Sequence, residues 1–163
     1  MSNICYRDTI GDIVHRSGHV MTGYLNDAEK TAEAFEFGWF HSGDLGRFDA
    51  DGYLYVVDRK KDMIKTGGEN VASREVEEVI YHYPGIEEVA VIGLADPKWI
   101  EIVAAVAVPK KGVSLIEKEI IAHCRERLAG FKCPKKVMIV DKLPKNPSGK
   151  ILKRELKNKF GVQ

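Results

Sequence analysis

The feature that most constrains the fold of this chain is a run of charged residues between a strand-like and a helix-like segment. Residues 53–57 are aromatic and β-branched, which favours a pleated surface. Residues 58–62 then place five charges in succession, Asp-Arg-Lys-Lys-Asp. Because a core does not accept unpaired charges, we interpret this run as a boundary between two packed units. An ordinary solvated exit from a hairpin is the alternative interpretation.

The segment after the charges is suited to a turn that opens into a helix. Gly67 and Gly68 allow the backbone to adopt positive φ and to approach a ligand closely. Ser73 is predicted to cap the following helix, and Glu75, Glu77 and Glu78 suit the positive end of that helix.

We therefore predict an α+β fold in two parts. Residues 1–57 form a small, mostly β piece, and residues 58–163 form a compact domain in which helices pack on a small sheet. With 163 residues and an ordinary globular composition, the chain is long enough for such a core.

In the first part, residues 11–17 are predicted to form a strand and residues 27–35 a short helix with a capping residue. Residues 39–46 form an aromatic strand, and a hairpin turn follows at residues 48–53. Glycines bracket Asp44 in this strand. We expect its carboxylate to stand clear of neighbouring side chains and to accept hydrogen bonds.

In the second part, apolar residues recur at the spacing of one buried helix face, at Val76, Val79, Ile80 and Tyr83. The β-branched runs 89–94 and 100–108 are predicted to pair as antiparallel strands.

Further along, Ser114 and Glu117 have the spacing of a capping box. They precede an amphipathic helix ending at Gly130. Residues 136–140 are predicted to form another strand, and residues 151–159 a short helix after a loop rich in Pro and Gly. The predicted apolar stripe of the amphipathic helix comprises Ile116, Ile120, Ile121, Cys124 and Leu128.

Charge and cysteine content exclude several classes of protein. A net charge of +1 gives no field for capturing nucleic acid, so any bound anion should be small. Cys5, Cys124 and Cys133 lack CxxC spacing, which favours a reducing cytoplasm and structural thiols. No apolar run approaches the length of a membrane span.

Familiar catalytic motifs are missing, and no metal site is predicted. The chain contains no Walker loop, no GxGxxG after a strand, no GxSxG and no HExxH. His15 and His19 are four residues apart, but a Ser-Gly turn between them argues against a metal pair on one helix face.

Three residues are candidates for chemistry, each with a structural alternative. Asp44 could accept two ribose hydroxyls or only tie a corner through backbone N–H groups. Arg59 could bind a hydroxyl pair or phosphate, or be an ordinary solvated arginine. Lys150, on a mobile loop, could bring a positive charge to a phosphate, or it could be one basic residue among the many in this tail.

Four ordered motifs cover nearly the whole chain, and together they carry a family resemblance. They are Gly23-Tyr24-Leu25 with residues 31–35 (TAEAF), residues 38–46 (GWFHSGDLG), residues 58–77, and residues 147–156 (PSGKILKREL). In this order they resemble the C-terminal portion of an AMP-forming acyl-CoA synthetase of the adenylate-forming superfamily, with medium- and long-chain fatty-acyl-CoA ligases most similar.

The resemblance implies a two-step reaction. A carboxylate, such as a fatty acid, attacks the α-phosphate of ATP to give acyl-AMP and pyrophosphate, and coenzyme A then displaces AMP. By resemblance Asp44 holds the ribose hydroxyls, Arg59 assists at the ribose, and Lys150 is the catalytic lysine of the first step. Lys61 is the hinge of the small lid domain, and Gly68 lies against the pantetheine arm of coenzyme A.

The resemblance also marks what the chain lacks. Ser42 and Ile100 stand where the family commonly has Thr and Gly. The phosphate-binding loop, the adenine-contacting segment, the acyl pocket and the ligands of the family's Mg²⁺ all belong to a region upstream of residue 1. We therefore expect the chain alone not to adenylate a fatty acid.

Two other functions stay open at this point. One is a non-catalytic module that binds adenine nucleotides or coenzyme A, and the other is a subunit that complements a separate large-domain chain. We also expect unpaired β edges in residues 1–57, through which a homodimer could form.

Overall fold

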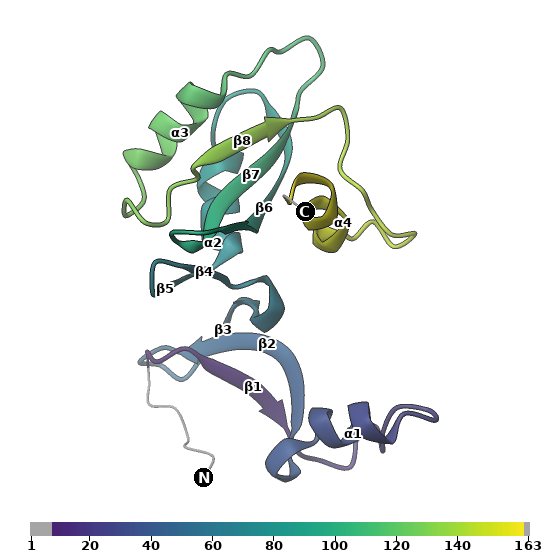
Figure 1. Cartoon of the computed structure of the whole chain (residues 1–163). Coiled ribbons are helices and arrows are strands. Elements are labelled where there is room, and N and C mark those ends of the chain that lie inside the picture. Colours follow the sequence, from purple (N-terminus) through teal and green to yellow (C-terminus); the bar gives the residue numbers. More distant parts are fainter. Residues whose placement is uncertain (1–7, 162–163) are drawn as a thin grey trace. The chain divides into compact units, whose positions relative to one another are not determined.

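In the computed structural model, which describes residues 8–161, the chain separates into a first unit, Met1–Lys61, and a second unit, Asp62–Gln163. The predicted α+β class is confirmed, since both helices and antiparallel sheets are present (Figure 1). The division between the units falls within the short 3-10 helix η2 (Lys60–Asp62), in the charged run.

The first unit is built on a three-stranded antiparallel sheet in the order β1-β2-β3. Its helix α1 begins after Asp27, whose carboxylate accepts the Lys30 N–H at 2.9 Å, as an N-cap residue should. The elements are β1 (Gly11–His15), α1 (Ala28–Ala34), the 3-10 helix η1 (Glu36–Gly38), β2 (Phe40–Phe48) and β3 (Leu54–Arg59).

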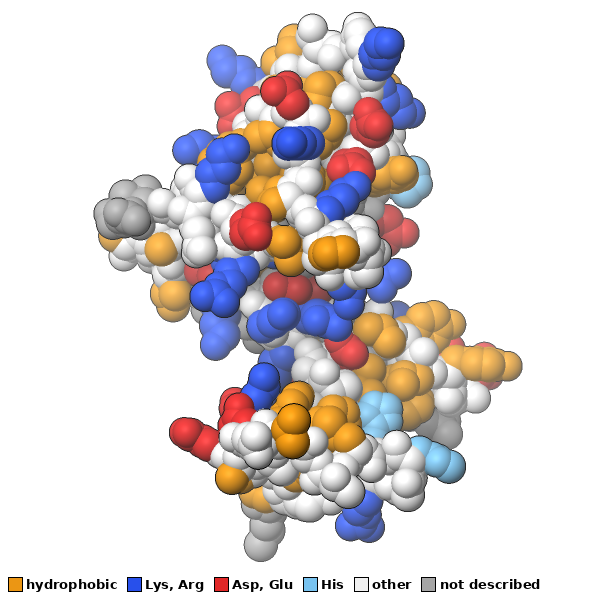
Figure 2. Space-filling model, turned by 90° about the vertical axis from the view of Figure 1, so that its right-hand side faces the viewer, with side chains coloured by type: hydrophobic (Ala, Val, Ile, Leu, Met, Phe, Trp, Pro, Cys, Tyr) orange, Lys and Arg blue, Asp and Glu red, His pale blue; other side chains and the backbone are white. Residues whose placement is uncertain are grey.

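Strand β3 of this unit leaves large apolar side chains exposed. Leu54, Tyr55 and Val56 are each about half exposed, and apolar side chains are visible on the surface of the unit in the lower part of Figure 2. Strands β1 and β3 are the two edges of this sheet. The expected homodimer through such an edge stays a prediction.

The second unit contains a five-stranded sheet and three helices. Its strands run in the order β5-β4-β7-β6, and β8 pairs with β7 in parallel. The elements are β4 (Ile64–Thr66), β5 (Glu69–Val71), α2 (Ser73–Tyr81), β6 (Ile86–Asp96), β7 (Ile100–Pro109), α3 (Glu117–Arg125), β8 (Lys136–Ile139) and α4 (Lys153–Phe160).

Strands β6 and β7 contribute to apolar clusters on both faces of the sheet. Alternate side chains of a strand point to opposite faces, so Val91 packs with helices α2 and α3 while its neighbours Ala90 and Ile92 pack with α4. The predicted antiparallel pairing is confirmed, with Val91 opposite Ala105. Burial on both faces explains why these segments read as continuous apolar runs.

The predicted buried face of helix α2 is confirmed, whereas the predicted cap is wrong. Val76 and Ile80 have no exposed surface. Ser73, however, lies inside the helix, with Ala72 at the cap position and no side-chain cap. Its hydroxyl instead accepts a hydrogen bond from Lys153 Nζ at 2.6 Å.

The capping box predicted for helix α3 is also wrong. The helix begins at Glu117 with Ile116 at the cap position, and it ends at Arg125. Glu117 uses Oε1 to accept the Val137 N–H of strand β8 at 2.8 Å. Ile116, predicted on the apolar stripe, is 52% exposed.

Two of the three cysteines belong to the core of the second unit. Cys124 and Cys133 are buried and unoxidised. Burial raises the pKa of the Cys124 thiol to about 11, with a further contribution from the neighbouring Cys133. Cys5 lies outside the described residues.

None of the helices within residues 8–161 is both long enough and apolar enough to span a membrane.

Candidate functional site

Asp44 and Arg59 face each other across strands β2 and β3. The antiparallel register pairs these two residues directly, and Arg59 Nε lies 3.4 Å from Asp44 Oδ1. The expectation that Asp44 stands clear of neighbouring side chains is therefore wrong, because cross-strand pairing brings the guanidinium to it. Both side chains are partly exposed, 34% for Asp44 and 45% for Arg59, so both keep surface for a ligand.

Ser42 and Gly43 shape the strand just before Asp44. The Ser42 hydroxyl donates to the Ile13 carbonyl at 2.9 Å and accepts the Asp44 N–H at 3.1 Å. Gly43 has φ of +78°, a conformation that other residues rarely adopt. The glycine corner expected around Asp44 thus depends on one hydroxyl and one left-handed residue.

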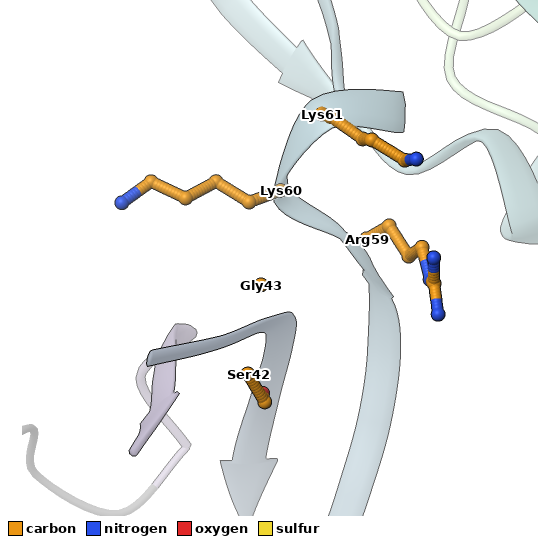
Figure 3. A pocket seen from close by; sticks show the side chains of 5 residues that line it. All are labelled: Ser42, Gly43, Arg59, Lys60 and Lys61. Carbon is orange, nitrogen blue, oxygen red and sulfur yellow. The ribbon is translucent and has the colours of Figure 1, made fainter. Parts of the chain in front are cut away.

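An open hollow lies beside this corner, at the end of strand β3. Its lining residues are Ser42, Gly43, Arg59, Lys60 and Lys61. The Arg59 and Lys60 side chains leave the chain in opposite directions there (Figure 3). Three adjacent cationic residues around one hollow favour an anionic ligand.

Lys60 also forms an ion pair within the first unit that sequence reasoning missed. Its Nζ lies 2.7 Å from Asp12 Oδ2, and His41 Nδ1 lies 3.4 Å from the same oxygen. Partial burial acts to raise the pKa of Asp12, but the hydrogen bonds and charges of Lys60 and His41 hold that pKa below its ordinary value. Asp12 and Lys60 are 48 residues apart, and no local motif joins them.

Asp58, within the charged run, is buried at 8% exposure as part of strand β3. Its Oδ1 accepts the Arg59 N–H at 2.7 Å. The run thus contains one residue that helps to fix the backbone of Arg59.

In the second unit, Gly67 and Gly68 form the turn between strands β4 and β5. Their φ values are +59° and +88°, so both need the freedom of glycine. The Gly67 N–H donates to the Trp99 carbonyl at 2.9 Å, and the Trp99 ring lies where a Cβ on Gly67 would stand. The space beside Gly68 is open.

Lys150 lies in a hairpin that is closed by backbone and side-chain hydrogen bonds. Lys145 and Ile151 form a β-bridge at the base. The Asn146 side chain accepts the Lys150 N–H at 2.8 Å, while the Lys150 carbonyl accepts the Asn146 N–H at 2.9 Å. Lys150 itself is exposed, and no partner for its ammonium group is found within residues 8–161.

The predicted site residues thus fall into two groups. Asp44, Arg59 and Lys61 belong to the first unit, where the first two form an ion pair and the last two line one hollow. Gly68 and Lys150 belong to different turns of the second unit.

The described part of the chain offers no cluster of three or more His, Cys, Asp or Glu side chains that could hold a metal ion. The Mg²⁺ implied by the resemblance therefore finds no ligand set among these residues, and we assign it no step.

The second unit matches the family of the AMP-binding enzyme C-terminal domain over residues 75–150. The chain is 52% identical over 151 residues to feruloyl-CoA synthase of Amycolatopsis sp, a match that covers 93% of this chain and 31% of the relative. It is 48% identical over 152 residues to the long-chain-fatty-acid–CoA ligase FadD13 of Mycobacterium tuberculosis, covering 93% of this chain and 30% of the relative.

Among solved structures, ATP-bound MatB from Rhodopseudomonas palustris matches with a TM-score of 0.90 and 39% identity, over 96% of this chain and 31% of that chain. The chain spans about a third of the length of the curated relatives that it matches. Residues 75–150 thus match the AMP-binding enzyme C-terminal domain, and over nearly all its length the chain is similar to the C-terminal portion of adenylate-forming acyl-CoA synthetases.

Proposed function

We propose that this chain supplies the C-terminal part, with the mobile lid and the catalytic lysine, of an ATP-dependent, AMP-forming carboxylate–CoA ligase. The reaction converts a carboxylate, ATP and coenzyme A into an acyl-CoA, AMP and pyrophosphate. The phosphate-binding loop and the acyl pocket come from a further region of the ligase, outside these 163 residues.

The observation that carries this proposal is the state of Lys150. Its ammonium group is exposed next to a tight turn and has no partner within residues 8–161. Several other lysines of the same unit are engaged, as with Lys132 and Glu75. An unpaired cation on an ordered hairpin is available to an external anion, and it needs little ordering when that anion arrives.

The first step accumulates charge on phosphoryl oxygens, and Lys150 is the residue that stabilises this charge. Asp44 accepts hydrogen bonds from the ribose hydroxyls. Arg59 donates hydrogen bonds to the ribose from the edge of its guanidinium that Asp44 does not occupy. The distance of 3.4 Å between them supports these roles, since an ion pair this long leaves hydrogen-bonding capacity for a ligand.

The remaining two residues serve the second step. Gly68 has open space beside it, which admits the narrow pantetheine arm of coenzyme A. Lys61 is the last residue of the first unit, and a change in its backbone dihedrals separates the two half-reactions.

The test is a chimera in which this chain replaces the matching 151 residues of the Amycolatopsis feruloyl-CoA synthase. Adenylation is followed by pyrophosphate release, and thioester formation by the reaction of coenzyme A with preformed acyl-AMP. We expect Lys150→Ala to reduce adenylation about 10²–10³-fold, the loss seen when one group that stabilises transition-state charge is removed. Thioester formation should change by less than about threefold, because the adenylate is already made.

Lys142→Ala is the matched control. Lys142 is an exposed lysine just before the hairpin, and the described part of the chain offers it no carboxylate partner. This variant should leave both half-reactions unchanged. If Lys150→Ala leaves adenylation intact, or lowers both half-reactions equally, Lys150 does not have the proposed role.

Two experiments on the isolated chain distinguish the proposed ligase role from the two other functions. Calorimetric titration with ATP, AMP and coenzyme A should give dissociation constants of about 1 mM or weaker, because the chain offers few contacts to each ligand. A micromolar constant would favour a non-catalytic binding module. Restoration of activity on mixing with a separate large-domain chain would favour a complementing subunit.

A further inference from the structure

The Lys150 hairpin continues into helix α4, whose first residue is Lys153. The Lys153 ammonium donates to Ser73 Oγ at 2.6 Å and lies 2.7 Å from Glu77 Oε1. Lys153 is only 17% exposed and Glu77 only 22%. Helix α4 is therefore joined to helix α2 by a partly buried, charge-assisted contact three residues from Lys150.

The Glu77 carboxylate is itself held in place by the sheet. The same Oε1 accepts the backbone N–H of Val91 on strand β6 at 2.8 Å. One carboxylate oxygen thus joins helix α2, strand β6 and helix α4. Because the strand is buried on both faces, its backbone gives this oxygen a firm anchor besides Lys153.

This contact differs in kind from the apolar packing of helix α4. Leu156 is buried at 2% exposure against the sheet and attaches the helix there. Apolar burial is non-directional, so it tolerates rotation or sliding of the helix. Charge-assisted hydrogen bonds to two defined oxygens, by contrast, specify one geometry.

The other lysine contact beside the hairpin is more exposed. Lys145, at the base of the hairpin, pairs with Glu88, and these side chains are 38% and 32% exposed. Exposed ion pairs contribute little to stability or position because water screens them. Of the two, the Lys153 contact is therefore the better placed to orient the hairpin.

We propose that Lys153 is a positioning residue for Lys150. By fixing the start of helix α4 to Glu77 and Ser73, it holds the hairpin so that Lys150 is presented in one direction. The inference rests on the proposed function for its catalytic consequence, whereas its structural content concerns this chain alone.

The first measurement uses the chain as it is. Backbone ¹⁵N relaxation reports the mobility of the Ser148, Gly149 and Lys150 amides in Lys153→Met, Lys153→Arg and a matched control, Lys159→Met. Lys159 lies in the last turn of the same helix, and no carboxylate partner for it is found within residues 8–161. We expect Lys153→Met to lower the heteronuclear NOE of the hairpin amides. In Lys153→Arg and Lys159→Met these NOE values should equal those of the original chain. Unchanged values in Lys153→Met would overturn the proposal.

Lys153→Met leaves the Glu77 carboxylate without its cation, which destabilises the unit independently of positioning. Glu77→Gln provides the second variant, because its amide oxygen still accepts the Val91 N–H while the charge is lost. It should loosen the hairpin in the same direction by a smaller amount. If Lys153→Met does not fold, an unchanged hairpin in Glu77→Gln would be the refuting result.

The second measurement uses the chimera with feruloyl-CoA synthase. Lys153→Met should lower the turnover of adenylation about 10–100-fold, since a displacement of about 1 Å of a catalytic group can cost about 10²-fold. The KM for ATP and the rate of thioester formation should change less than about threefold, and Lys153→Arg should restore most of the turnover. An equal fall of both half-reactions would reduce Lys153 to a purely structural residue.

The two proposals fail in distinguishable ways. If Lys150→Ala leaves adenylation intact, the proposed function fails while the relaxation data still decide whether Lys153 orders the hairpin. If Lys150→Ala abolishes adenylation and Lys153→Met changes neither turnover nor relaxation, only the positioning proposal fails.

Discussion

Ile100 has a backbone conformation that disagrees with its side chain. Its φ is +71°, in the left-handed region, although its side chain is β-branched. It begins strand β7, where it pairs with Thr66 of strand β4 and with Asp96 of strand β6. These pairings over-determine the backbone, so strain is expected at a residue that adjoins the turn of Gly67.

The magnitude of the strain follows from comparing two substitutions. The left-handed conformation costs an L-residue about 1–2 kcal/mol, whereas glycine adopts it without that cost. Ile100→Ala and Ile100→Gly remove nearly the same side-chain contacts, but only glycine removes the strain. Glycine loses about 0.5–1 kcal/mol relative to alanine through its greater freedom in the unfolded chain. We therefore expect Ile100→Gly to be more stable than Ile100→Ala by about 0.5–1 kcal/mol.

The matched control is Ile139, a partly exposed strand residue in the same unit, at 43% exposure against 67% for Ile100. There the order should reverse, with glycine less stable than alanine by about 0.5–1 kcal/mol. The difference between the two positions isolates the strain, about 1–2 kcal/mol. Urea unfolding followed by Trp99 fluorescence, in a Trp39→Phe background, measures all four variants. If alanine and glycine rank the same way at both positions, the backbone of Ile100 does not carry this strain.

Three further predictions concern other described residues. Gly68→Ala should lose about 1–2 kcal/mol of stability from positive φ alone, and Gly67→Ala should lose more, because its new Cβ would also meet the adjacent indole ring at 2.8 Å; urea unfolding compares the two. Lys60→Met should raise the pKa of Asp12 toward its ordinary value, as read from carboxyl ¹³C titration. Because that pKa is depressed in the folded protein, the stabilisation by Lys60 should be present above about pH 4 and be lost as the pH falls through the folded pKa. Cys124, buried with a pKa of about 11, should react with a thiol reagent at pH 8 only as fast as the second unit opens, so its labelling rate should rise with urea in parallel with unfolding.

The parts of the fold that sequence predicted best are those determined by local periodicity. The apolar runs 89–94 and 100–108 form the central strand pair, and the spacing of Val76 and Ile80 marks the buried face of helix α2. Periodic burial is a property of neighbouring residues, so it can be read within one window of sequence.

The predictions that failed concern side chains engaged by distant partners. Ser73 looks like a helix cap, but Lys153, eighty residues away, occupies its hydroxyl. Glu117 looks like half of a capping box, but it accepts the N–H of Val137. Local competition for backbone N–H groups cannot reveal a tertiary partner that arrives from elsewhere in the chain.

The candidate site shows the same division. The family motifs made Asp44 and Arg59 candidates, and the β2–β3 register places the two residues opposite each other. The contact of Asp12 with Lys60 had no sequence signal, because it depends on how strand β1 pairs with strand β2. The predicted boundary after residue 57 falls inside strand β3, which continues to Arg59. The sequence indicates a boundary there because charged residues usually face solvent, whereas Asp58 is buried.

The alternation of side chains along strand β6 has a consequence for engineering the second unit. Val91 belongs to the layer with helices α2 and α3, and its neighbour Ile92 to the layer with helix α4. Redesign of one layer can therefore leave the other unaltered, even at adjacent codons. A library of substitutions confined to the Ile92 side would change the packing of helix α4, which follows the Lys150 hairpin. It would leave the packing of helices α2 and α3 unchanged.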